Sequence, residues 1–91
     1  MIKQLLTIQN KLGLHTRAAA KLVDLTKRFE SQVELTYRER TVDSKSIMGV
    51  ITLGAQKDDV VEVLIDGADE KDALQAIEVL VNNKFGEDWH M

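Results

Sequence analysis

His15 and Arg17 are the two side chains of this 91-residue chain whose types and spacing could do chemistry together. His15 follows Gly13 and Leu14 and directly precedes the predicted first turn of an amphipathic helix. The unpaired N–H groups of a helix start attract anions, and a guanidinium binds phosphate through two parallel hydrogen bonds. A neutral imidazole nitrogen at such a place is a nucleophile for phosphorus. The spacing therefore predicts a phosphoryl acceptor at His15.

Two neighbours would hold the oxygens of that phosphate. Arg17 would clamp them, and Thr16 would contribute its backbone N–H, with its hydroxyl as a further donor. Plainer interpretations stay open on spacing alone. A histidine beside a helix start often serves as a polar cap or a surface residue, and a helical arginine is most often a solvated charge.

The hydrophobic pattern predicts three helices. The first begins around Thr16, the last follows Asp69-Glu70 and ends near Phe85-Gly86, and a short one lies between Ser46 and Gly54. Acidic residues suit the positive end of the last helix, and Val50 and Leu53 can fill the single inward face of the short one. The apolar stripe of the first helix comprises Ala19, Leu22, Leu25, Thr26 and Phe29.

Four segments alternate with the period of a strand or follow a tight turn. They lie around residues 6–8, 33–37, 40–42 and 61–65, and the turn falls at Arg38-Glu39. The resulting order is β-α-β-β-α-β-α. This order, with strands that are apolar on one side, predicts an α+β domain whose sheet carries helices on one face.

Two segments resemble the hallmarks of the HPr family, the histidine-containing phosphocarriers of the bacterial phosphotransferase system. Residues 13–20, GLHTRAAA, resemble the active-centre motif, and residues 43–49, DSKSIMG, resemble the regulatory serine and docking helix. The ending at residues 83–88 is similar to proteobacterial members, including the nitrogen-branch paralogue NPr. The resemblance implies an open-faced β-sandwich, four antiparallel strands covered by three helices, as one domain over residues 1–91.

The resemblance also implies a function. His15 would take a phosphoryl group at Nδ1 from enzyme I, which draws it from phosphoenolpyruvate, and pass it to enzyme IIA. The chain would be a carrier phosphorylated on histidine rather than a turnover enzyme, with no cofactor and no metal. Two alternatives remain: a carrier in the nitrogen-related regulatory branch, and a small interaction module in which His15 is incidental.

Position 18 departs from the family pattern, because Ala18 stands where the family usually has proline. Alanine is a strong helix former, so the helix is expected to persist. Proline would fix φ and remove one N–H early in the helix, so its absence bears on how rigidly the turn from His15 to Arg17 is held.

Ser46 is predicted to cap the short helix. The resemblance gives it a second role, as the target of HPr kinase/phosphorylase in some bacteria. A phosphoserine is tolerated at a helix N-terminus, but it adds roughly two negative charges beside the docking surface.

A partner surface is predicted around this short helix and the start of the first one. Its apolar part would be exposed beside His15 and rimmed by lysines, a pattern that is typical of docking sites. Each lysine also has the plain interpretation of a solvated charge. The residues are Leu14, Ala20, Lys21, Lys27, Lys45, Ile47, Met48 and Ile51.

Composition restricts the remaining possibilities. A net charge of −3 argues against nucleic-acid binding, and the absence of cysteine excludes disulfides and thiolate metal sites. No apolar run suits a bilayer or a secretory signal, so a cytoplasmic chain that does not bind membranes is expected. A carrier that docks successive partners through one face is expected to be a monomer. Trp89 and His90 are predicted to lie in a mobile tail, and His90 is too far from His15 along the chain to predict a metal site.

Overall fold

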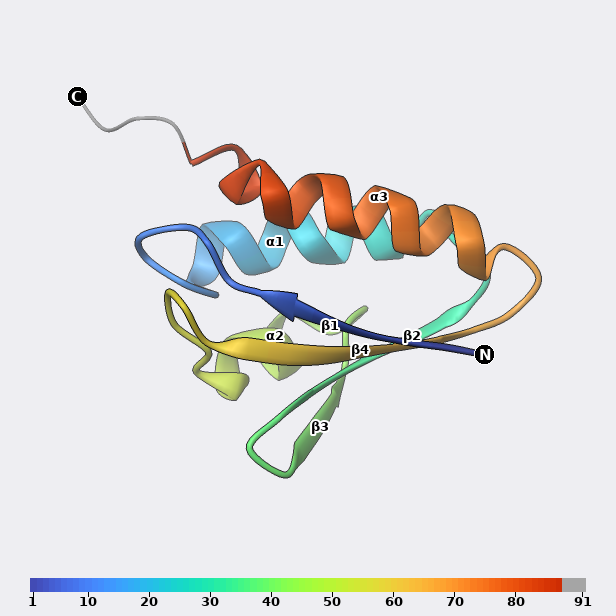
Figure 1. Cartoon of the computed structure of the whole chain (residues 1–91), viewed down its shortest axis with the longest axis horizontal. Helices are drawn as coiled ribbons and strands as arrows, with labels where there is room; N and C mark the ends of the chain where they lie inside the picture. The colour runs from blue at the N-terminus through green and yellow to red at the C-terminus, as the bar shows by residue number, and fades with distance from the viewer. Residues whose placement is uncertain (88–91) are drawn as a thin grey trace.

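The computed structural model describes residues 1–87 of the chain; the predictions for Trp89 and His90 concern residues outside that range. The element order confirms the predicted β-α-β-β-α-β-α arrangement, with a 3₁₀ turn at the end (Figure 1). The elements are β1 (Ile2–Thr7), α1 (Thr16–Thr26), β2 (Gln32–Tyr37), β3 (Arg40–Asp43), α2 (Ile47–Leu53), β4 (Val60–Asp66), α3 (Glu70–Asn82) and the 3₁₀ turn Lys84–Gly86.

The four strands form one antiparallel sheet in the order β1-β4-β2-β3. The central strand β4 places Ile65 opposite Ile2 on one side and Val33 on the other, so apolar side chains of three strands meet on one face. Helices α1 and α3 lie side by side over that face (Figure 1). The predicted α+β open-faced sandwich is therefore confirmed.

One hydrophobic core lies between the sheet and the helices. The alternation of the strands supplies one half of it and the helical stripes supply the other, because each element buries the face that its period makes apolar. As predicted, α2 contributes Val50 and Leu53. The strands and the two long helices contribute Leu6, Val33, Leu35, Val61, Val63, Ile65, Ala18, Ala19, Leu22, Val23, Ala73, Ile77 and Val81.

Two helix ends differ from the prediction. Helix α1 ends at Thr26, and Phe29, assigned to its stripe, lies in the following turn, where its N–H bonds to the Thr26 carbonyl at 3.2 Å. Helix α3 ends at Asn82, because Lys84 and Phe85 adopt φ of 58° and 55°, which an α-helix cannot accommodate. Phe85 nevertheless turns its side chain into the core.

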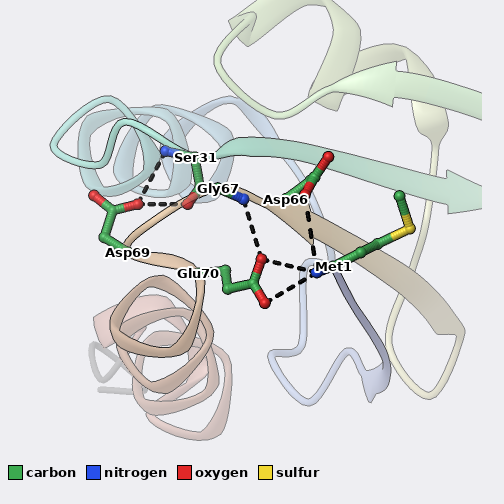
Figure 2. A network of polar contacts seen from close by, with 6 residues as sticks. All are labelled: Met1, Ser31, Asp66, Gly67, Asp69 and Glu70. Atoms are coloured by element: carbon green, nitrogen blue, oxygen red, sulfur yellow. Dashed lines mark hydrogen bonds and ion pairs between the residues drawn. The ribbon is translucent and has the colours of Figure 1, made fainter.

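Two carboxylates hold the segment that leads into α3 (Figure 2). Glu70 accepts from the Gly67 N–H at 3.1 Å and from the Met1 amino group at 2.9 Å. Asp69, directly before α3, instead accepts hydrogen bonds from the hydroxyl and N–H of Ser31, directly before β2, so the starts of the two elements are held together. The Ser31 hydroxyl and then the Glu30 N–H lower the pKa of Asp69, and the Met1 amino group lowers the pKa of Glu70.

Within residues 1–87, the helices are all too short or too polar to cross a bilayer.

Candidate functional site

His15 is the N-cap residue of α1. Its backbone is extended, with φ −77° and ψ 179°, and its carbonyl accepts the first helical bond, from the Ala19 N–H at 2.8 Å. The ring completes the cap, because Nδ1 accepts the N–H of Arg17 at 3.2 Å. The capping interpretation is thus correct, and it also places a ring nitrogen among the N–H groups of a helix start.

The segment before His15 is fixed by a tight turn and by the loop that follows α2. The Asn10 side chain is buried and donates to the Gly13 carbonyl at 2.7 Å, while the Gly13 N–H bonds to the Asn10 carbonyl at 3.2 Å. The Leu14 N–H then bonds to the Ala55 carbonyl at 3.0 Å. The histidine therefore follows a well-anchored backbone.

Leu14 corrects one prediction. The sequence predicts it on the partner surface, but only 5 % of it is exposed, and it belongs to the hydrophobic core. The backbone bond to Ala55 holds the chain against the core at this point, so the Leu14 side chain points inward. A partner that docks beside His15 cannot contact it extensively.

A carboxylate that sequence reasoning did not assign to the site lies against the other side of the ring. The Nε2 atom of His15 is 3.0 Å from Oε2 of Glu87, in the segment that follows α3. Asn10 donates to the same oxygen at 2.8 Å, and the Leu12 N–H donates to Oε1 at 3.1 Å. The Glu87 side chain is 7 % exposed, against 27 % for His15.

The chain reaches this position because Phe85 anchors it. The Phe85 side chain is buried in the core, and its carbonyl accepts from the Lys21 ammonium of α1 at 2.9 Å. Burial, the largest single influence, raises the pKa of the Glu87 carboxyl, but the hydrogen bonds from Asn10, His15 and Leu12 outweigh it and leave the pKa below its usual 4.5. Glu87 is therefore an anion at neutral pH.

Thr16 and Arg17 form the exposed first turn of α1, directly beside the imidazole. Both predicted phosphate-holding residues thus lie on the same helix start as His15. Ala18 follows them, fully buried, and the helix begins at Thr16 without the family's usual proline, as expected. The alanine methyl group packs into the core.

The predicted apolar partner surface is partly exposed. Met48 is 68 % exposed and Ile47 is 42 % exposed, whereas Ile51 and Ala20 are half-buried. Helices α1 and α2 pack against each other, so this surface adjoins the helix that carries His15. Ser46 caps α2 as predicted, its hydroxyl accepting the Gly49 N–H at 3.2 Å.

Two of the three predicted rim lysines make structural contacts. Lys45 donates to the Phe29 carbonyl at 2.9 Å, as Lys21 does to that of Phe85. Their charges are therefore held in place beside α1 rather than extended into solvent. Lys27 is exposed at the C-terminal end of α1, the end farther from His15.

Among the described residues, no three histidine or acidic side chains gather as metal ligands. The site thus consists of an imidazole with a helix N-terminus on one side of its ring and a buried carboxylate on the other.

Comparison with known proteins shows the family and the fold of the chain. Residues 2–83 match the family described as "PTS HPr component phosphorylation site". The phosphocarrier protein HPr of Xylella fastidiosa strain Temecula1 is 49 % identical over 88 residues, covering 97 % of this chain and 99 % of that protein. The HPr of Neisseria meningitidis strain Z2491 is 46 % identical over 87 residues, covering 96 % and 98 %.

A solved structure, HPr-C-His from Thermoanaerobacter tengcongensis, superposes with a TM-score of 0.92 at 39 % identity, covering 97 % of this chain and 99 % of that one. The fold and these matches define the class as phosphocarrier proteins. The chain belongs to the HPr family, the phosphocarrier proteins of the phosphotransferase system.

Proposed function

We propose that His15 accepts a phosphoryl group from phosphorylated enzyme I, which obtains it from phosphoenolpyruvate, and passes it to an enzyme IIA. The observation that carries the proposal is the position of His15 Nδ1 at the N-cap of α1, 3.2 Å from the Arg17 N–H. A phosphate bonded to that nitrogen would lie at a helix N-terminus, where backbone donors and the helix dipole favour negative charge.

The transfer is an in-line displacement. The lone pair of Nδ1 forms the new N–P bond while the N–P bond of the donor phosphohistidine breaks, and its electron pair returns to the donor ring. The N–H groups at the start of α1 and the Arg17 guanidinium would neutralise the three phosphoryl oxygens. Positioning and charge supply the catalysis, so no cofactor or metal is required.

The test is incubation with enzyme I and phosphoenolpyruvate, followed by intact mass measurement under mildly alkaline conditions. We expect the mass of one phosphate, lost on mild acid treatment and lost again when a cognate enzyme IIA is added. A demonstrably active, cognate enzyme I that leaves the mass unchanged would contradict the proposal. It would also put the interaction-module alternative first.

The partners would dock on the exposed apolar surface of α2. Met48 and Ile47 supply apolar area, and Lys45, which precedes α2, supplies fixed positive charge beside it. Exposed apolar groups rimmed by charge favour an acidic protein surface, and methionine adapts to more than one partner. A carrier that presents one face to successive partners is expected to work as a cytoplasmic monomer, in either the sugar or the nitrogen-related branch.

Ser46 is proposed as a regulatory phosphorylation site for an HPr kinase. Its side chain is exposed, and a phosphate oxygen could still accept the Gly49 N–H that the hydroxyl now binds. The added charge would lie beside Met48 and oppose an acidic partner.

With an HPr kinase and ATP, we therefore expect an acid-stable phosphate and slower uptake of phosphate from enzyme I. Ser46→Asn is the control, because asparagine keeps an N-cap acceptor but has no hydroxyl. A phosphorylated Ser46→Asn chain would show that another residue is the target.

A further inference from the structure

The two nitrogens of the His15 ring face groups of opposite hydrogen-bonding character. Nδ1 faces the backbone N–H of Arg17, which can only donate. Nε2 faces Oε2 of Glu87, and an ionised carboxylate can only accept. One neutral tautomer satisfies both contacts, the one with its proton on Nε2 and its lone pair on Nδ1. The other neutral tautomer would set two donors against each other at Nδ1 and two acceptors at Nε2.

The surroundings of Glu87 favour its ionised form. Its two oxygens receive three donors, Asn10 and His15 on Oε2 and the Leu12 N–H on Oε1. Those donors favour the anion over the protonated acid, in line with the lowered pKa of the Glu87 carboxyl. The contact with His15 is therefore a charge-assisted hydrogen bond held in a largely buried place.

We propose that Glu87 is a positioning residue for phosphoryl transfer: it fixes the His15 tautomer with Nδ1 as the nucleophile and stabilises the charge that the ring acquires. The inference rests on the proposed role of His15. As Nδ1 bonds to phosphorus, the proton stays on Nε2 and the ring moves from neutral toward positive. The interaction with the carboxylate is then stronger in the transition state than in the starting state, which is the condition for accelerating the step.

The test is Glu87→Gln, which keeps size and removes charge. The site offers donors only, so the NH₂ group of glutamine must face either the Leu12 N–H or the pair formed by Asn10 and His15. We expect the rate of phosphate uptake from enzyme I to fall by about tenfold, as for a lost charge-assisted hydrogen bond. The matched control is Glu62→Gln on the other face of the sheet, which removes the same charge and should leave the rate unchanged.

A second readout separates positioning from mere folding and does not depend on transfer. Ring ¹⁵N chemical shifts distinguish protonated from unprotonated nitrogens, and the His15 signals are identified by their absence from His15→Ala. In the unsubstituted chain we expect a protonated Nε2 and an unprotonated Nδ1 at pH 8. In Glu87→Ala the two shifts should move toward each other as both tautomers become populated.

The outcomes are distinct. Unchanged ring shifts in Glu87→Ala, or an unchanged rate in Glu87→Gln, would overturn the role of Glu87 while leaving His15 as the acceptor. Failure of the unsubstituted chain to take up phosphate would overturn the proposed function instead, and the ring shifts would still report whether Glu87 selects the tautomer.

Discussion

Alanine at position 15 is expected to leave the chain unable to take up phosphate from enzyme I, a complete loss rather than a slower rate. No other imidazole among the described residues lies at the start of α1, so the N–H groups there would have no nucleophile beside them. The intact mass after incubation with enzyme I and phosphoenolpyruvate measures the loss directly.

His15→Ala also removes a structural contact, because Nδ1 caps α1 and Nε2 bonds to Glu87. Loss of a helix N-cap costs about 0.5–2 kcal/mol, so His15→Ala is also expected to lower the stability of the fold. His15→Asn is the matched control. Asparagine is a strong N-cap but cannot attack phosphorus, so we expect a folded chain that takes up no phosphate. Phosphate on either variant would show that the acceptor lies elsewhere.

The fold follows from the sequence to the extent that periodicity decides it. The alternation in residues 61–65 and the helical stripe after Asp69-Glu70 each leave one apolar face, and one sheet covered by helices buries both. The predicted ends of α1 and α3 are wrong because a helix end depends on backbone dihedral angles, which apolar spacing does not encode. At Phe85 a positive φ and a buried ring occur together, whereas the spacing indicates a continuing helix.

The residues of the site also fall into those that the sequence predicts and those that it does not. His15, Thr16 and Arg17 are adjacent in the chain, so their common place at a helix start could be predicted locally. Glu87 is 72 residues from His15, and the turn after α3 brings the two together. An acidic residue near a chain end has no local pattern that indicates such a contact. The prediction for Leu14 is wrong because closeness to His15 in sequence does not reveal which way a loop side chain points.

Gly13→Ala is expected to destabilise the chain more than any other single methyl addition near the site. Gly13 has φ of 70°, and a Cβ there would lie 2.6 Å from the Ala55 carbonyl oxygen and 2.8 Å from Gln56 Cα. Both atoms are backbone, so neither can rotate away. The left-handed conformation costs a non-glycine residue about 1–2 kcal/mol, and the clash raises the expected loss to about 2–4 kcal/mol.

Gly54→Ala is the control, because Gly54 has the same φ of 70° and an added Cβ would meet nothing within 4 Å. Gly54→Ala should lose only the stability that the left-handed conformation costs. The difference between the free energies of unfolding of the two variants, measured in urea, then gives the cost of the clash. The clash must separate residues 13 and 55, and the neighbouring bond from the Leu14 N–H to the Ala55 carbonyl must lengthen with it. His15 would then move relative to Glu87, so phosphate uptake should slow in Gly13→Ala and not in Gly54→Ala. Equal stabilities and equal rates in the two variants would mean that the loop after α2 does not position the histidine.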